Sequence, residues 1–120
     1  IIDNHNHHKK SKTSTINKTK ELIEQGLTLE SIAKTRSLTL GTIISHIRQL
    51  IQEEGYHNYH HLIDEQQYQD MFPIYKEIIE RHETPKAYSV YQKLQKRYSQ
   101  QRVLLALIIL DNITDLGHYA

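Results

Sequence analysis

The spacing of apolar residues predicts a chain made of helices. From about residue 13 onward, apolar side chains return every three or four positions, as along one face of an α-helix, and no segment alternates as a strand does. The clearest case is residues 40–52, where the apolar set is Leu40, Ile43, Ile44, Ile47, Leu50 and Ile51. The pattern predicts an all-α fold of about six or seven helices.

Residues that favour helix ends divide the first half of the chain into three helices. A threonine at the start supplies an acceptor for unpaired backbone amides, and a glycine after the end takes up the left-handed conformation that closes a helix. The expected boundary residues are Thr13 and Gly26 for one helix, Thr28 and Arg36 for the next, and Thr39 and Gly55 for the third, Leu40–Gln52.

The second half begins with an aromatic connector, residues 56–63, which we expect on the surface. Asp64 and Gln67 have the spacing of a capping box and predict a helix start. Pro73 lies inside the helical pattern that follows, so it is expected to kink that helix or split it near Met71.

Two more helices are predicted after residue 83. Thr84 followed by Pro85 is a start signal, with threonine as the cap and proline in the first turn. Ser99 is expected to cap the last helix, in which Val103–Leu110 is apolar on every side. Such a helix is normally central in a bundle or lies at a subunit interface, and central burial is the simpler expectation.

These elements predict four consecutive parts of the chain. Polar composition without helical periodicity marks the beginning as a linker. The parts are a flexible polar linker over residues 1–13, a core over 14–55, a helical extension packed on that core over 56–112, and a tail over 113–120.

The second and third predicted helices carry the features of a helix-turn-helix. Ala33 is small enough to let the two helices approach near their connecting turn, and Leu38 is placed to fill that turn. Ile43 and Ile47 can then pack back against Ile32. The opposite face of the third helix is left to enter a DNA major groove.

Eight side chains on and beside this face are the candidate DNA contacts. They are Thr39, Thr42, Ser45, His46, Arg48 and Gln49 on the third helix, with Lys34 and Arg36 near the turn. Each also has an ordinary structural explanation: Thr39 as a helix cap, His46 as a packed histidine, Arg48 as a solvated or ion-paired charge. The residues alone leave both explanations open.

The start of the third helix also favours a different kind of partner. Leu40, Gly41 and Ile44 are expected to be exposed there, and an apolar patch of this kind can mark a protein interface. The alternative function is therefore a docking module that recruits a helicase or another DNA-processing protein.

The distribution of charge limits how strongly the chain can bind DNA. The net charge is only +1, and the first 20 residues hold five lysines and one aspartate. The positive field therefore lies in this N-terminal stretch and in a few isolated side chains, and we expect weak, salt-sensitive binding that is assisted by the rest of a larger protein.

Two further basic groups have two interpretations each. Lys9, Lys10 and Lys12 form either a phosphate-binding arm or a solubilising linker. The other group holds cations and tyrosines that either contact unpaired bases or belong to the protein core. Its members are Lys93, Lys96, Arg97 and Arg102, with Tyr91 and Tyr98.

The core sequence resembles LuxR/FixJ-type helix-turn-helix domains. The similar pairs are Ile32-Ala33, Leu38-Thr39, Thr42-Ile43 and His46-Ile47. The resemblance implies the output domain of a transcription regulator. Those domains end after one more helix, whereas this chain continues for about 65 residues.

The continuation resembles a narrower family, the helicase-associated helix-turn-helix domain of some RecQ-type helicases and of a Firmicute protein encoded beside RecQ. That family has a stretch of the form Y-x-x-I-R-l-v-l-A, which Tyr98, Arg102 and Ala106 match, with Gln101 in place of an apolar residue. The resemblance covers about Thr13–Leu110. It implies a non-catalytic DNA-binding accessory domain that serves a helicase in DNA repair or recombination and contacts duplex or forked DNA.

The sequence gives little support to enzyme or metal functions. It has no cysteine, no pair of carboxylates at catalytic spacing and no glycine-rich phosphate loop. We expect no catalytic residue, no cofactor, no metal and no small-molecule substrate. The histidine groups considered as metal ligands are His5, His7 and His8, and His57, His60 and His61 beside Asp64, neither with a second regular ligand pair.

A membrane location is also not expected. The longest apolar run, Val103–Leu110, has eight residues, whereas a bilayer span needs ~20. No signal peptide is visible, so we expect a cytoplasmic protein. Because the first residue is not Met, the chain is expected to be a piece of a longer protein.

Overall fold

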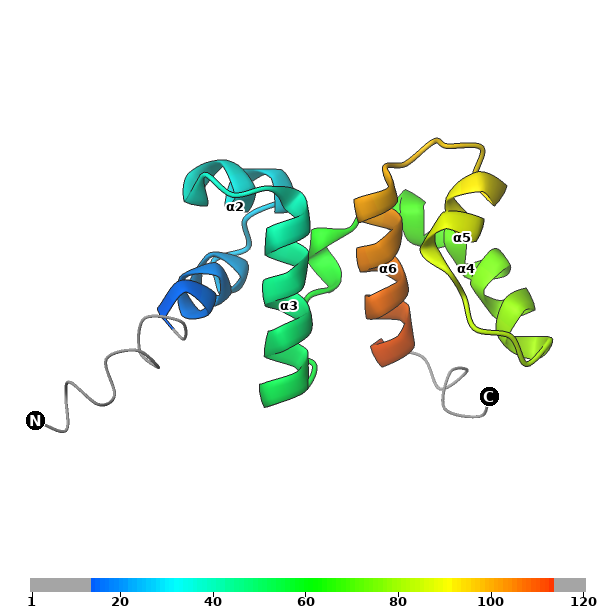
Figure 1. The fold of residues 1–120 in the computed structure, drawn as a ribbon, viewed down its shortest axis with the longest axis horizontal. Helices are drawn as coiled ribbons and strands as arrows, with labels where there is room; N and C mark the ends of the chain where they lie inside the picture. The colour runs from blue at the N-terminus through cyan, green and yellow to red at the C-terminus, as the bar shows by residue number, and fades with distance from the viewer. Residues whose placement is uncertain (1–13, 114–120) are drawn as a thin grey trace, which may run out of the picture. The chain divides into compact units, whose positions relative to one another are not determined.

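A computed structural model describes residues 14–113, and every regular element in that range is helical (Figure 1). In chain order these are a helix over residues 14–24, α2 (Leu29–Arg36), α3 (Leu40–Glu54), a 3-10 helix η1 (His60–Leu62), α4 (Glu65–Glu80), α5 (Ala87–Lys93) and α6 (Gln100–Ile113). The predicted all-α fold is confirmed for this range. The expected linker over 1–13, and the tail after residue 113, lie outside the described residues.

The chain divides into two compact units between His57 and Asn58. The first unit contains the helix over residues 14–24, α2 and α3, and the second contains η1 and α4 to α6. The division lies close to Gly55, where we expected the core to end. That the extension packs on the core stays a prediction.

Both threonine caps of the helix-turn-helix form as predicted. Thr28 Oγ1 accepts a hydrogen bond from Ser31 N at 3.1 Å, and Thr39 Oγ1 accepts one from Thr42 N at 3.1 Å. α3 continues past the predicted Gln52 to Glu54 and ends at Gly55.

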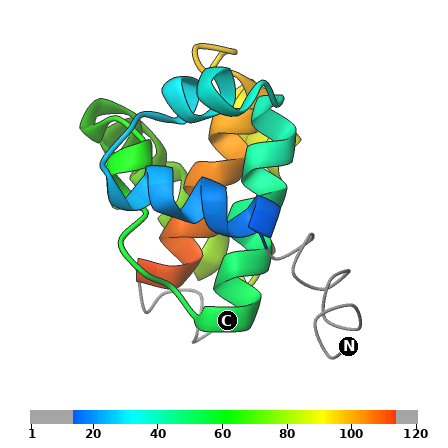
Figure 2. The same cartoon turned by 90° about the vertical axis from the view of Figure 1, so that its left-hand side faces the viewer.

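The helix over residues 14–24, α2 and α3 make up the first unit (Figure 2), and aliphatic side chains form its core. Ile32 of α2 and Ile43 and Ile47 of α3 have no exposed surface, and α2 contacts α3 directly. Ile16 and Ile23 of the helix over residues 14–24 are buried as well. The inward-facing residues of the predicted helix-turn-helix are therefore the ones that the structure buries.

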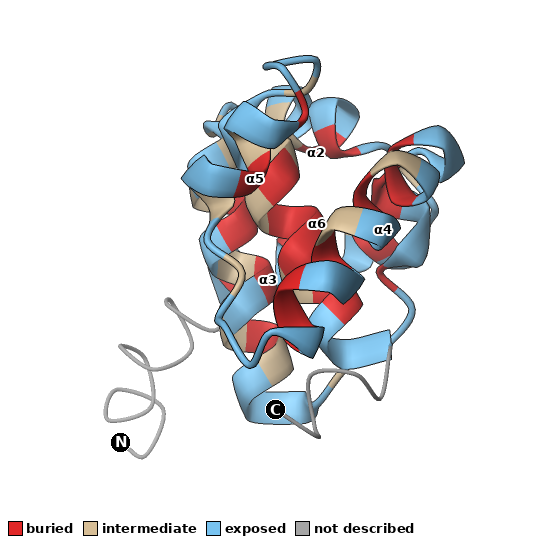
Figure 3. Ribbon diagram, turned by 90° about the vertical axis from the view of Figure 1, so that its right-hand side faces the viewer, coloured by how far each residue is buried: buried red, intermediate tan, exposed pale blue. Residues whose placement is uncertain are grey.

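In the second unit α6 contacts both α4 and α5 (Figure 3) and has most of its side chains buried. Its buried side chains are Val103, Leu105, Ala106, Leu107, Ile109 and Leu110. The expectation that this apolar helix is buried is confirmed. Ser99 caps it as predicted, since Ser99 Oγ accepts a hydrogen bond from Arg102 N at 3.2 Å.

Four helices end on the same backbone motif, and only one of them does so with glycine. In this motif a residue of positive φ follows the helix. Its amide and the next amide donate hydrogen bonds to carbonyls of the last helical turn. Gly26 has this role after residues 14–24, as predicted. The residues of positive φ that end α2, α4 and α5 are Ser37 (φ 55°), His82 (φ 60°) and Gln95 (φ 57°).

The connector between the units is less exposed than predicted. Tyr59, Leu62 and Ile63 are each only 3% exposed, so placing residues 56–63 on the surface was wrong for these three. Leu62 of η1 and the two residues that flank this turn, Tyr59 and Ile63, are directed inward, and burial of their apolar area outweighs the irregular backbone.

α4 begins after Asp64 as predicted, but without a capping box. Asp64 makes no side-chain cap hydrogen bond, and Gln67 is fully buried. Gln67 Nε2 instead donates to the carbonyl of Arg102 at 3.1 Å and to Met71 Sδ at 3.3 Å. The Gln67 side chain, which would have completed the capping box, therefore contacts α6 instead.

Pro73 does not split α4, which is continuous from Glu65 to Glu80. Pro73 and Gln69, one turn before it, are both exposed, so the carbonyl that loses its amide partner lies on the solvated side of the helix. Met71 and Tyr75 are fully buried on either side of the proline. Their burial anchors the helix on both sides of the proline.

α5 begins later than predicted. Its N-cap is Lys86, so Pro85 precedes the helix instead of occupying its first turn, and Thr84 is not the cap. Val90 is fully buried and Leu94 is 1% exposed. Burial of these two residues sets where the helix lies, and it overrides the local start signal.

Replacing Ser37 with glycine should stabilise the protein by roughly 0.5–1 kcal/mol. The left-handed conformation costs a residue with a Cβ about 1–2 kcal/mol, and glycine gives back about 0.5–1 kcal/mol in unfolded-state entropy. The free energy of unfolding from urea denaturation measures the difference. Ser37→Ala, which keeps the Cβ, is the control, and an equal gain in both variants would contradict the explanation.

Candidate nucleic-acid interface

One face of α3 is exposed along the whole helix. Because Ile43, Ile44, Ile47 and Leu50 are buried, the opposite side is left to smaller and polar residues. Gly41, Ser45, Arg48 and Gln52 are all exposed and follow one another at helical spacing. These four residues are called the α3 stripe below. Thr42 and Gln49 flank it and are half-buried.

The α3 stripe is more positive toward its N-terminal end. The first turn of α3 contains no acidic residue, so the positive end of the helix dipole is unopposed there. The acidic residues lie at the other end, where Gln49 Nε2 donates to Glu53 Oε1 at 3.1 Å and Lys20 Nζ lies 2.7 Å from Glu54 Oε1. An anion therefore meets the least repulsion near the turn between α2 and α3.

Thr39 and Thr42 differ in what they can offer a phosphate. The Thr39 hydroxyl accepts from Thr42 N and donates to Thr42 Oγ1 at 3.0 Å, so its proton is used inside the chain. The Thr42 hydroxyl keeps its own proton for an outside acceptor. Of the two predicted contacts, Thr42 is the better donor.

Arg36 and His46, two of the predicted DNA contacts, belong to a polar network inside the first unit. Arg36 Nη1 donates to the Thr15 carbonyl at 2.8 Å and to Thr19 Oγ1 at 2.6 Å. Thr19 Oγ1 also lies 2.8 Å from His46 Nδ1. The network ties the helix over residues 14–24 to both helices of the helix-turn-helix.

The network also accounts for the charge state of His46. Thr19 Oγ1 accepts from Arg36 and lies 2.8 Å from His46 Nδ1, a contact that either tautomer of the neutral imidazole can make. Burial, and secondly the nearby Arg36 charge, lower the pKa of His46. Both effects favour the neutral imidazole.

Thr19 was not predicted as a functional or core residue, although it is fully buried. The signal was available, because Thr19 lies three residues after Ile16 and four before Ile23, on the face that those residues bury. Thr19 thus connects Arg36 of α2 to His46 of α3, independently of any contact that these two side chains make with DNA.

The apolar patch expected at the start of α3 is not exposed as predicted. Ile44 is only 2% exposed, and Leu40 is half-buried. Gly41 is exposed but adds no apolar side chain. The predicted patch therefore loses Ile44 to the core and keeps only part of Leu40 on the surface.

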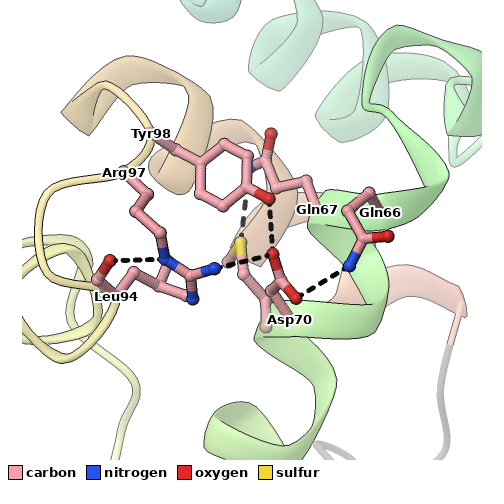
Figure 4. Close-up of polar contacts among 7 residues, drawn as sticks. Gln66, Gln67, Asp70, Leu94, Arg97 and Tyr98 are labelled. Carbon is pink, nitrogen blue, oxygen red and sulfur yellow. Dashed lines mark hydrogen bonds and ion pairs between the residues drawn. The ribbon is translucent and has the colours of Figure 1, made fainter.

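In the second unit, a carboxylate holds part of the predicted basic and aromatic cluster (Figure 4). Asp70 accepts hydrogen bonds from the Tyr98 hydroxyl at 2.5 Å, from Gln66 Nε2 at 3.0 Å and from Arg97 Nη1 at 3.3 Å. The bond from Tyr98, more than the others, lowers the pKa of Asp70, and it raises the pKa of Tyr98. Tyr98 and Arg97 are thus engaged inside the fold.

The remaining members of that cluster differ in exposure. Burial lowers the pKa of Arg102, and Tyr91 is half-buried with its ring 6.2 Å from that of Tyr88. Lys93 and Lys96 are exposed. These two lysines are the part of the cluster that points most clearly to solvent.

Lys34 and Arg48 are the exposed cations of the predicted interface, and neither has an ion pair within residues 14–113. For all eight predicted residues, contact with DNA stays a prediction. The structure separates them into side chains on the surface of the helix-turn-helix and side chains, Arg36 and His46, that hold it together.

Within residues 14–113, no group of three or more metal-binding side chains lies close enough to hold an ion, so His57, His60 and His61 do not converge with Asp64. The group of His5, His7 and His8 lies outside the described residues. No helix in the described range has the length and hydrophobicity to cross a membrane.

Comparison with protein families gives one match. The sequence model of a family described as a helix-turn-helix domain matches residues 15–107, which span most of both units. Comparisons with curated proteins and with solved structures found no match.

Lowering the pH should destabilise the first unit through His46. Its pKa is lower in the folded chain than the ordinary value of about 6.5, so the unfolded chain binds the proton more readily. The stability that neutral His46 contributes is present above pH ~6.5 and is lost as the pH falls below it.

Urea denaturation at pH 7.5 and at pH 5.5 measures this loss. The wild type should lose more free energy of unfolding between the two than His46→Gln, which cannot titrate at this position. Equal losses would show that the network does not set the protonation of His46.

Proposed function

Because the chain belongs to the helix-turn-helix domain family, we propose that it is a non-catalytic DNA-binding domain that places α3 in the major groove. The observation that carries the proposal is the α3 stripe, Gly41, Ser45, Arg48 and Gln52, which is exposed and free of acidic side chains. A groove lined by phosphates disfavours carboxylates and favours donors such as these.

Gly41 supports a close approach to this face. Glycine within a helix costs about 0.5–1 kcal/mol relative to alanine, and the fold does not require it here. A Cβ added at Gly41 would meet only Thr39 Oγ1, at 3.9 Å, which is an ordinary contact. The missing side chain is useful if a phosphate backbone comes against the first turn of α3.

The proposal assigns different roles to the predicted residues. Arg48 contacts a phosphate or a guanine edge, and Ser45 and Gln49 contact base edges or the backbone. Thr42 and Lys34 contact phosphates beside the turn. Arg36, His46 and Thr39 position α3, the first two through Thr19 and the last as its cap.

We further propose that the domain serves a RecQ-type helicase or its partner in DNA repair or recombination, in the cytoplasm of a bacterium. The support is the resemblance of residues 98–106 to helicase-associated domains, together with the net charge of only +1. A domain that is held near DNA by a larger protein gains from a high effective concentration and does not need strong binding of its own.

Arg48→Ala should weaken binding to duplex or forked DNA about tenfold, because a contact to DNA by arginine is worth about 1–3 kcal/mol. Fluorescence anisotropy with labelled duplex, forked and single-stranded DNA, at low and at moderate salt, measures the effect. Lys18→Ala is the matched control, since Lys18 is an exposed lysine outside the α3 stripe.

Stronger binding to the fork than to the duplex would support service to a helicase, whereas sequence-dependent binding to duplex would favour a transcription regulator. A folded protein that binds none of the three at low salt would overturn the proposal in favour of protein docking. Equal weakening by both substitutions would remove the assigned role of Arg48.

Gly41→Ala should change stability and DNA binding in opposite directions. The added methyl group should stabilise α3 by about 0.5–1 kcal/mol, while it obstructs the approach of a phosphate backbone and weakens binding. Urea denaturation and anisotropy on the same sample test both. Unchanged affinity in the stabilised variant would show that DNA does not approach this turn.

A further inference from the structure

The second unit contains a pocket whose lining is dominated by cations. It has a volume of about 580 Å³ and lies between the end of α4, the loop over residues 81–86 and α5. The cations are Arg81, Lys86 and Lys93, and the lining has one carboxylate, that of Glu83. Nothing in the proposed role of α3 uses this pocket.

Neither of the two lysines forms an ion pair in the part of the chain that the structure describes, although Glu83 lines the same pocket. Arg81 forms an ion pair with Glu77, whereas neither Lys86 nor Lys93 pairs with any carboxylate among residues 14–113. Lys86 is the N-cap of α5 and Lys93 its last residue, and both line the pocket. Like charges gathered in one pocket attract an anion.

Hydroxyl groups complete a set of donors. Thr84 and Ser89 also line the pocket, and Ser89 lies on the α5 face between the two lysines. Ammonium, guanidinium and hydroxyl groups together are the donors that proteins use for phosphate oxygens. Ile78 is the one apolar residue in the lining.

Backbone hydrogen bonds join the loop beside the pocket to the last turn of α4. Glu83 N donates to the Ile78 carbonyl at 3.1 Å, and His82 N donates to the Ile79 carbonyl at 2.9 Å. These bonds satisfy two carbonyls of the last turn of α4. The loop is thus held in place without a ligand.

We propose that this pocket binds a phosphate group of a nucleic-acid backbone, so that the second unit makes its own contact with DNA. The inference goes beyond the role of α3 and rests on the proposed function only for the source of the phosphate. Nucleic acid is favoured over an acidic peptide because the chain belongs to a helix-turn-helix family and because a phosphodiester needs donors and charge but no apolar surface.

The test compares two double variants of the full chain in DNA binding at several salt concentrations. Lys86→Ala/Lys93→Ala removes two charges from the pocket, and Lys76→Ala/Lys96→Ala removes two exposed lysines of the same unit that do not line it. The pocket variant should bind duplex DNA about tenfold more weakly. Its slope of log K against log salt should be shallower by about 1–2 than that of the wild type, as expected for one or two lost phosphate contacts. The Lys76→Ala/Lys96→Ala control should keep most of the affinity and most of the salt slope of the wild type.

Amide NMR spectra of the wild type identify the ligand and keep the test independent of the fold of the variants. Addition of duplex DNA should shift the amides of residues 84–93. Shifts of these amides by inorganic phosphate or by poly-glutamate, with none by DNA, would overturn the proposal in favour of a free anion or an acidic protein.

The outcomes separate this proposal from that for α3. If Arg48→Ala weakens binding while the pocket variant behaves like its control, the pocket proposal fails and the role of α3 stands. If the pocket variant weakens binding and Arg48→Ala does not, the pocket proposal holds and the assignment to α3 fails.

Discussion

Ile43, Ile47 and Leu50 of α3 lose almost all contact with water, and that burial determines how the helix is rotated about its axis. Each such side chain contributes about 1.5–3 kcal/mol when it is buried, whereas an exposed ion pair contributes about 0–1 kcal/mol. The apolar face therefore outweighs every polar contact that α3 makes. Once it is buried, Gly41, Ser45 and the residues in line with them are the ones that remain for a partner.

The polar network of Arg36, Thr19 and His46 has a second role in the same unit. Apolar packing sets which face of α3 is buried, but it tolerates small shifts of one helix along another, whereas hydrogen bonds between particular atoms do not. Thr19 connects Arg36 of α2 to His46 of α3, with distances of 2.6 and 2.8 Å. The first unit thus combines a core that orients the exposed stripe with a network that keeps α2 and α3 in register.

The two proposed contacts, one by α3 and one by the pocket of the second unit, also explain how a chain with a net charge of +1 can bind DNA. Charge that is spread evenly gives little local field, but a few cations without partners give a strong one at short range. Arg48 and Lys34 supply it in the first unit, and Lys86 and Lys93 in the second. Two weak contacts in one chain strengthen each other when both reach the same DNA.

The sequence by itself determined the helices, the caps Thr28, Thr39 and Ser99, and the inward-facing residues of the helix-turn-helix. These features depend on residues three or four positions apart, such as Thr28 with Ser31 or Ser99 with Arg102, so the local pattern contains them. Only the tertiary structure decided which polar groups are buried and which candidate contacts are held inside. Thr19 meets His46 across 27 residues, and Gln67 meets Arg102 across 35. The gathering of Arg81, Lys86 and Lys93 in one pocket likewise depends on how α4 and α5 pack. Helical periodicity does not encode such contacts, because they depend on how separate helices meet.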